Sequence, residues 1–178
     1  MTESVKKRRL FFALWPDDAV RNEIVRRFEN TPQYAMQGGK TTPSNLHITL
    51  HFIGNVDEPT MACLQQAAKT VQAAAFELKL DNLGYFSRPQ VFWLGCSNPP
   101  EGLQKLHQQL AEVLFPCGYE AEARPFSPHV TLMRKLREPG DFVPIESINW
   151  PVQSFALIES VACPDGVQYQ LVENYFLY

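Results

Sequence analysis

The chain has 178 residues, of which 45% are hydrophobic and 20% charged, and its formal net charge at pH 7 is −3. This length is sufficient to bury a substantial core, and the composition is that of an ordinary globular protein. The acidic balance disfavours a protein that binds long nucleic acids by counterion release, because that mode needs a broad basic surface. We expect any RNA or DNA partner to be held locally.

Four cysteines are scattered through the chain. They are Cys63, Cys96, Cys117 and Cys163. The chain has no Cys-x-x-Cys pair and no disulfide-scaffold spacing, so we interpret all four as reduced thiols of a cytoplasmic protein. The basic residues at 6–9 lead into an apolar run of six residues. That run is too short for a signal peptide or a membrane span, and no membrane association is expected.

Strands and helices are predicted to alternate along the chain. We predict strands at 10–15, 47–53, 76–80, 91–94, 129–132, 155–161 and 169–178, and helices that begin near residues 16, 58 and 99. The apolar residues of the strands are continuous or alternate, whereas those of the helices form stripes three to four positions apart. Strands interspersed with helices in this order favour an α+β fold with antiparallel sheets.

Two short motifs share the pattern His-x-Thr-Leu. They begin at His47 and His129, 82 positions apart (129 − 47), and each has a proline four residues before its histidine. In a strand, residues i and i+2 share a face. Each histidine therefore shares a face with its threonine, Thr49 or Thr131. Two such pairs facing each other would direct two imidazoles and two hydroxyls at one small anionic group.

The elements that precede each motif also repeat. A strand, a proline-initiated helix, a loop and the motif strand occur over approximately residues 8–54 and again over 90–136. A shift of 82 places Phe11 on Trp93 as well as one histidine on the other. A repeat this long predicts one internally duplicated domain spanning residues 1–178, with pseudo-twofold symmetry.

The paired histidines suit acid and base catalysis, because the pKa of imidazole lies near neutrality. Arg124 or Arg134 would add charge-assisted hydrogen bonds to a phosphate. Arg134 lies an odd number of positions from His129, so it reaches the same face only if the strand bends or ends nearby. A single His-x-Thr-Leu is also typical of a half-buried strand with a satisfied polar face; its duplication in one register favours the functional interpretation.

Other candidate residues are less specific. His51 lies about 13 Å along the strand from His47, so one metal ion cannot bind both rings, and His51 is expected at a cleft rim or in packing. His107 is expected to be a solvated or half-buried helix residue. Tyr34, Phe126 and Trp150 are the candidates for stacking on a nucleobase. A metal hydrolase is the weakest alternative, since no acidic metal cluster is evident.

The doubled motif and its flanks resemble the two-histidine (2H) phosphoesterase superfamily, in particular its RNA 2′,3′-cyclic phosphodiesterase or 2′-5′ RNA ligase branch. The matching features are the run at 9–14, Asn45-Leu46, Phe52-Ile53-Gly54, the segment at 124–128, and Arg134. The resemblance covers essentially the whole chain. It implies a bilobal α+β fold with two antiparallel sheets, flanking helices and a central active-site groove, without a metal or other cofactor. His51 is a departure from the pattern.

The resemblance also implies residue roles. His47 would be the general acid that protonates the departing 3′-oxygen, and His129 the general base that activates water. Substrate would be bound by Thr49, Thr131, Arg134 and Phe126. The expected reaction converts RNA 2′,3′-cyclic phosphate ends, those of tRNA fragments included, to 2′-phosphomonoesters, and its reversal would give 2′-5′ ligation.

Two alternatives stay open at this point. One is a phosphodiesterase acting on another small cyclic or 2′-5′-linked nucleotide, because the motifs specify a phosphoryl group more firmly than its attachments. The other is a non-catalytic binder of nucleotides or RNA ends. In each case we expect a cytoplasmic monomer.

Overall fold

A computed structural model describes residues 6–178 of the chain. Its strands are β1 (Arg8–Leu14), β2 (Gly39–Lys40), β3 (Ile48–Val56), β4 (Phe76–Leu80), β5 (Asn82–Phe86), β6 (Val91–Gly95), β7 (His129–Arg134), β8 (Ile148–Val152), β9 (Ser154–Cys163) and β10 (Gly166–Phe176). Its α-helices are α1 (Asp18–Glu29), α2 (Glu58–Ala68) and α3 (Glu101–Leu114). Short 3-10 turns cover Pro32–Ala35, Pro43–Asn45 and Phe115–Cys117.

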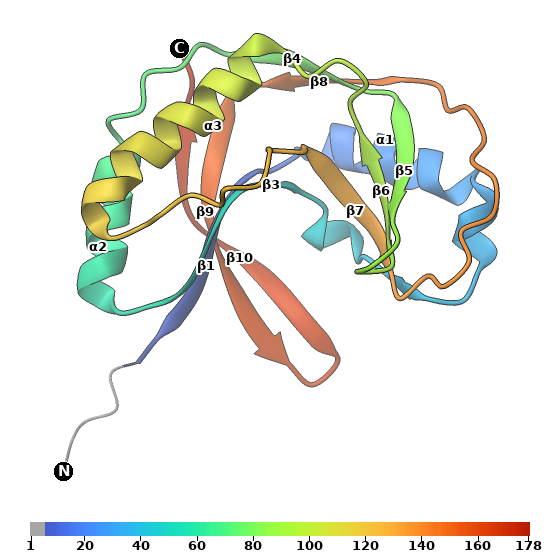
Figure 1. Cartoon of the computed structure of the whole chain (residues 1–178), viewed down its shortest axis with the longest axis horizontal. Coiled ribbons are helices and arrows are strands. Elements are labelled where there is room, and N and C mark those ends of the chain that lie inside the picture. Colours follow the sequence, from blue (N-terminus) through green and yellow to red (C-terminus); the bar gives the residue numbers. More distant parts are fainter. Residues whose placement is uncertain (1–5) are drawn as a thin grey trace.

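The strands form two sheets. The larger has the order β10-β9-β1-β3-β7-β6-β5 with β2 beside β7, and the smaller pairs β4 with β8. All of these pairs are antiparallel. The predicted α+β fold with two antiparallel sheets is confirmed, and the larger sheet runs through both halves of the chain (Figure 1).

Each helix begins within two residues of its predicted start. The side chain of Asp17 caps α1 by accepting the backbone N–H of Val20 at 2.9 Å, and Asp57 caps α2 in the same way at Thr60. The apolar stripes of α1 and α3 are buried. Those stripes are Val20, Ile24 and Phe28 on α1, and Leu103, Leu106, Leu110 and Leu114 on α3.

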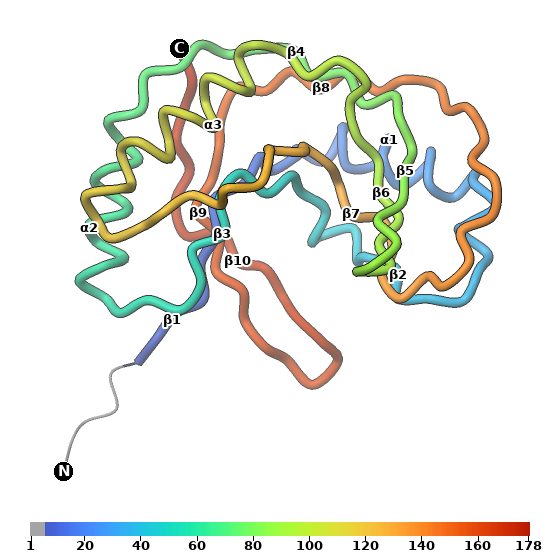
Figure 2. The backbone as a smooth tube through the Cα atoms, in the orientation of Figure 1, coloured from blue at the N-terminus to red at the C-terminus, as the bar shows by residue number. Residues whose placement is uncertain are grey.

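The two helices that follow β1 and β6 cross over between the halves. Phe28 of α1 packs against Phe92 of β6, with ring centroids 6.0 Å apart. In the other half, the backbone carbonyl of His107 on α3 accepts a hydrogen bond from His51 of β3. Figures 1 and 2 show the same exchange: α1 lies on the β5–β6–β7 side and α3 on the β1–β3–β9 side. The two halves therefore share one core.

The two halves meet where β3 pairs with β7. This ladder consists of a single pair, Ile48 with Val130, which are themselves 82 positions apart. The outer neighbours of the two motif strands do not keep this spacing: Ala13 is opposite Thr49, whereas Trp93 is opposite Thr131. The shift of 82 matches Trp93 with Phe11, but the strand partners match it with Ala13, two residues further on. Bulges in both pairings account for the difference. Internal duplication remains our proposal for this arrangement.

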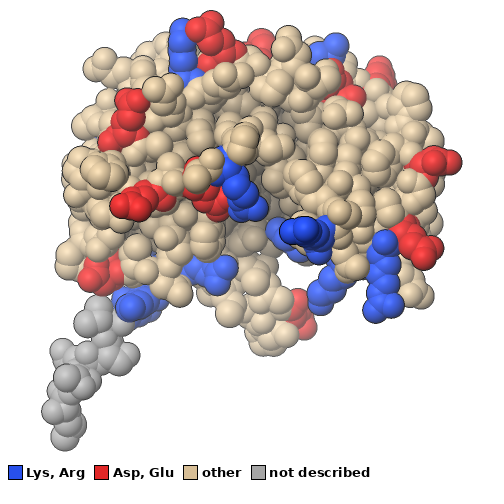
Figure 3. All heavy atoms as spheres, viewed as in Figure 1, with Lys and Arg blue, Asp and Glu red and all other residues tan. Residues whose placement is uncertain are grey.

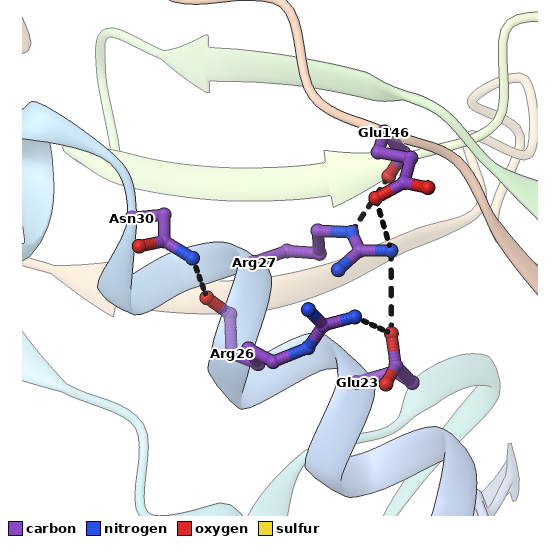
Figure 4. A network of polar contacts seen from close by, with 5 residues as sticks. All are labelled: Glu23, Arg26, Arg27, Asn30 and Glu146. Carbon is purple, nitrogen blue, oxygen red and sulfur yellow. Dashed lines mark hydrogen bonds and ion pairs between the residues drawn. The ribbon is translucent and has the colours of Figure 1, made fainter.

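A network of polar contacts fastens α1 to the connection between β7 and β8 (Figure 4). The Arg27 guanidinium donates from Nε to the backbone carbonyl of Glu146 at 3.0 Å and pairs with its carboxylate at 3.0 Å. Arg26 and Arg27 both pair with Glu23 on the same helix. Ion pairs whose carboxylates are solvent-exposed, as those of Glu23 and Glu146 are, contribute little stability each, so the network chiefly fixes the position of the connection.

The prediction of four reduced cysteines is wrong. Cys63 of α2 and Cys117, just after α3, form a disulfide with their Cα atoms 5.8 Å apart. The two residues are 54 positions apart in sequence, so only the side-by-side packing of α2 and α3 brings them together. Cys96 and Cys163 are free thiols.

Among the helices of residues 6–178, none has the length and apolar character needed to cross a bilayer.

Replacing Cys63 by serine is expected to lower the free energy of unfolding by about 4 kcal/mol, because the bond closes a loop of 54 residues in the unfolded chain. Urea denaturation of the non-reduced variant and wild type measures this difference. Cys163→Ser, which removes an exposed free thiol, is the control and should leave the midpoint unchanged. Equal midpoints for both variants would contradict the disulfide.

Candidate active site

The two histidines lie at the junction of β3 and β7. Ile48 and Val130 are 1% and 0% exposed, so their side chains point into the core. Because strand neighbours face opposite sides, the motif histidines and threonines on either side of this pair point away from the core. Antiparallel register at Ile48–Val130 places His47 across from Thr131 and His129 across from Thr49. The two strands separate beyond this one pair.

Both imidazoles are anchored in the same way. Nδ1 of His47 lies 2.7 Å from the backbone oxygen of Asn45, and Nδ1 of His129 lies 2.7 Å from that of Ser127. A carbonyl oxygen only accepts, so each Nδ1 carries the hydrogen and each neutral ring has its lone pair on Nε2. Nε2 of His47 lies 3.0 Å from the Thr49 hydroxyl, which donates to it.

Two cavities of about 500 and 490 Å³ meet at Thr49 and Phe52. The first contains His129, and the second contains His47 and Arg134. The first is bordered by Thr49, Leu50, His51, Phe52, Phe86, Arg88, Pro89, His107, Tyr119, Glu122, Arg124, Pro125, Phe126, Ser127 and His129. The second is bordered by Arg9, Phe11, His47, Thr49, Phe52, Arg134, Ser160, Ala162, Val167 and Tyr169. We call the two together the groove.

Positive charge gathers around the groove although the chain is acidic overall. Four arginines border it: Arg9, Arg88, Arg124 and Arg134. Figure 3 shows Lys and Arg side chains around the hollow in the middle of the molecule. The local concentration of guanidinium groups fits an anionic ligand.

Among the described residues, Arg134 borders the groove and Thr131 does not. Arg134 is the last residue of β7, and Lys135 after it has a φ of +58°, so the strand ends and turns there. This break places Arg134 in the cavity of His47 despite its odd spacing from His129. Thr131 is half-buried opposite Trp93, and within residues 6–178 it is not among those that border either cavity.

Burial lowers the pKa of both histidines. For His47 it is the main cause, with repulsion from Arg134 and His129, and the pKa falls to about 4. The rings that surround His47 belong to Phe11, Trp15 and Tyr169, with centroids 4.9, 5.9 and 5.2 Å away. Burial and Arg134 also lower the pKa of His129. Both rings are therefore neutral at pH 7 in the free protein.

His51 lies inside the protein rather than at its surface. It is 3% exposed, its Nδ1 is 3.0 Å from the Tyr119 hydroxyl and its Nε2 donates to the His107 carbonyl at 2.8 Å. His107 is half-buried, one of the two environments expected for it. Its ring stacks between those of His51 and Phe126, at centroid distances of 4.1 and 3.9 Å. The three rings form a column beside the cavity of His129.

Of the three aromatic candidates for base stacking, only Phe126 borders the groove. Trp150 is 4% exposed within β8, because its segment pairs with β4 instead of forming a loop. Tyr34 packs edge-on against Phe28 of α1. Sequence reasoning missed Phe52, Phe86 and Tyr169, whose positions depend on tertiary packing and carry no local signal.

Carboxylates do not gather at the groove. Among residues 6–178, no three His, Cys, Asp or Glu side chains lie close enough together to hold a metal ion. The polar groups that the groove offers are imidazoles, hydroxyls and guanidiniums, which suit a phosphoryl group.

Comparison with known proteins decides the family. The model of the 2′-5′ RNA ligase superfamily matches residues 16–160. The chain belongs to this superfamily. The RNA 2′,3′-cyclic phosphodiesterase of Escherichia coli is 35% identical over 152 residues, which cover 85% of this chain and 83% of that protein. The protein of the same name from Thermotoga maritima is 30% identical over 178 residues, 92% of each chain.

Solved structures of this superfamily have the same fold. The crystal structure of E. coli LigT in apo form superposes with a TM-score of 0.85 at 31% identity, over 97% of this chain and 98% of that one. The structure of E. coli LigT complexed with 3′-AMP superposes with a TM-score of 0.86 at 31% identity, over 97% and 99%.

The lowered histidine pKa values predict acid destabilisation. All four histidines have a pKa below the ordinary 6.5, and those of His47 and His107 are about 4. The unfolded chain thus binds protons more readily than the folded one, and the free energy of unfolding should fall from pH 6.5 towards pH 4. Urea denaturation at pH 7 and pH 4 should differ by more than about 1.4 kcal/mol, the equivalent of one pKa unit.

Double replacement of the stacked pair, His51→Gln and His107→Gln, is the control for this effect. It removes two of the four titrating rings and should make the decline with pH shallower. An unchanged free energy of unfolding between pH 7 and pH 4 in the wild type would contradict neutral histidines.

Proposed function

We propose that this protein hydrolyses RNA 2′,3′-cyclic phosphate ends to 2′-phosphomonoesters by acid and base catalysis from two histidines, without a metal ion. One observation carries the proposal: His47 and His129 border one groove. Each ring has Nδ1 hydrogen-bonded to a backbone carbonyl, which leaves Nε2 as the nitrogen that can take or give a proton. Relatives at 26–35% identity that are named RNA 2′,3′-cyclic phosphodiesterases support the choice of substrate.

The proposed acid is His47. An anionic phosphate beside a buried imidazole favours its charged form, so substrate binding would raise the pKa of His47 and supply the proton. The protonated Nε2 can no longer accept from Thr49, whose hydroxyl is then free to donate to a phosphoryl oxygen. His47 gives its proton to the 3′-oxygen as the bond from phosphorus to that oxygen breaks.

The proposed base is His129. Its neutral Nε2 takes a proton from water while the water oxygen bonds to phosphorus, and the 2′-phosphomonoester remains. His129 takes one proton and His47 gives one, so the step leaves the net charge of the protein unchanged. The two rings then return to their starting protonation by exchange with solvent. A ribose 5′-hydroxyl in place of water would lose its proton to His129 and bond to phosphorus as the 3′-oxygen leaves with the proton of His47, which forms a 2′-5′ bond.

Substrate contacts complete the proposal. Arg134 would bind phosphoryl oxygens from the cavity of His47, and Thr131 would do so from its place across the ladder from that histidine. Phe126, supported from behind by the stacked ring of His107, would stack on the terminal base in the other cavity.

A second candidate is the cleavage of another small cyclic or 2′-5′-linked nucleotide. The two cavities on either side of Thr49 have nearly equal volumes, about 500 and 490 Å³, which leaves room for a group on each side of a phosphodiester. Profiling dinucleotides against cyclic-phosphate ends separates the two candidates.

We also propose that the protein acts as a cytoplasmic monomer on RNA fragments such as cleaved tRNA. One chain carries both histidine motifs, so a site that uses both histidines does not require a second subunit, which supports the monomer. The Cys63–Cys117 disulfide weighs against the cytoplasmic location, because disulfides are uncommon there.

Incubation of the protein with an oligoribonucleotide ending in a 2′,3′-cyclic phosphate, in the presence of EDTA, should yield the 2′-phosphate. Separation of the 2′- and 3′-phosphate products by chromatography measures the outcome. Recovery of only the 3′-phosphate would contradict the assigned roles. Tight binding without turnover would instead identify a binding protein.

Replacing His47 or His129 by alanine should each lower kcat by at least about 10²-fold, the usual contribution of a positioned acid or base. Arg134→Ala should chiefly raise KM. The matched control is Arg137→Ala, three positions further along the chain and outside both cavities. Near wild-type rates in both histidine variants would refute the acid and base account.

A further inference from the structure

Asn45 connects the β9–β10 hairpin to His47. Its side chain is buried, its Nδ2 donates to the backbone oxygen of Val167 at 2.8 Å and its Oδ1 accepts from the backbone N–H of Tyr169 at 3.2 Å. Its own backbone oxygen accepts Nδ1–H of His47 at 2.7 Å. One residue therefore holds strand β10 with its amide and the imidazole with its carbonyl.

The hairpin strand that Asn45 holds forms one wall of the cavity containing His47. Val167 and Tyr169 of β10 both border this cavity. The Tyr169 ring contacts the His47 ring edge-on at 5.2 Å and that of Phe11 at 4.9 Å. Figures 1 and 2 show the hairpin extending away from the body of the protein. The ladder that joins β9 to β1 covers Ala156–Glu159, and the bonds from Asn45 hold the hairpin nearer its turn, at Val167 and Tyr169.

The second motif lacks this connection. The residue 82 positions after Asn45 is Ser127, whose carbonyl accepts Nδ1–H of His129 at the same 2.7 Å. The Ser127 hydroxyl, however, makes no hydrogen bond within residues 6–178, and no hairpin strand is tied to it. The two histidines have the same local anchor and different surroundings.

We propose that Asn45 is a positioning residue for His47: its amide fastens β10 over the imidazole and so keeps water from that ring, which distinguishes it from the otherwise equivalent His129. The catalytic consequence rests on the proposed function. The depressed pKa of His47, caused first by burial, agrees with the geometry. Loss of the amide would leave the carbonyl anchor in place while the hairpin separates from the ring.

The test is Asn45→Ser, which introduces the residue found at the counterpart position. We expect the His47 Nδ1–H to exchange with water at least about tenfold faster, the ratio expected when ordinary hydrogen bonds are lost. The pKa of His47, followed by NMR in the substrate-free protein, should rise towards 6.5 while that of His129 stays unchanged. In activity assays, the limb of the kcat/KM profile set by His47 should move to higher pH.

The matched control is Ser127→Ala, which removes the unpaired hydroxyl beside His129 and should alter neither ring. A folded Asn45→Ser variant with unchanged His47 exchange and pKa would overturn the inference. The NMR readouts need no substrate, so absence of RNA hydrolysis by the wild type would refute the proposed function and leave this test intact.

A second measurement needs no variant. If the hairpin shields His47 through Asn45, the N–H of Tyr169 and the Nδ1–H of His47 exchange through one opening event in the wild type. Their opening free energies should then be equal and respond equally to added urea. Faster opening at Tyr169, with His47 still protected, would overturn the inference even where Asn45→Ser fails to fold.

Discussion

The single backbone pairing of Ile48 with Val130 is the constraint on which the site depends. Both side chains are buried, which fixes the strand faces: the histidines and threonines on either side must point out of the core. A slip of one residue in either strand would bury its imidazole and expose an aliphatic chain. Because the ladder stops after one pair, the strands separate immediately, and the groove opens where the backbone pairing ends.

The exchange of helices between the halves explains why so short a ladder suffices. Phe28 of α1 packs on Phe92 of β6, and His51 of β3 bonds to the backbone of α3. Each half thus supplies the covering layer of the other, and separating the strands would expose the core that they share. The groove lies over one continuous core, so packing in both halves of the protein fixes the relative position of the two imidazoles.

Local sequence patterns predicted the parts of the structure that depend only on the spacing of nearby residues. The His-x-Thr pairs, the approximate starts of the helices and the apolar stripe of α3 are examples. Features that depend on chain pairing could not be predicted: the disulfide spans 54 residues, Trp150 is in a strand only because β4 pairs with it, and Tyr169 meets His47 from a distant hairpin. Arg134 borders the groove because β7 ends at this residue and the chain turns at Lys135, a tertiary feature that residue spacing does not show.

The proposed division into acid and base arises outside the duplicated motif. Both rings have Nδ1 on a carbonyl two residues earlier, so the motif alone gives them the same tautomer and the same basic nitrogen. Their difference lies in what covers them: Phe11, Trp15 and Tyr169 surround one ring, while Phe86 and Trp93 lie near the other. The more enclosed ring also shares its cavity with Arg134, which repels a proton until an anion arrives. A bound phosphate offsets that repulsion where the dielectric is lowest, so its effect on proton affinity is greatest at His47.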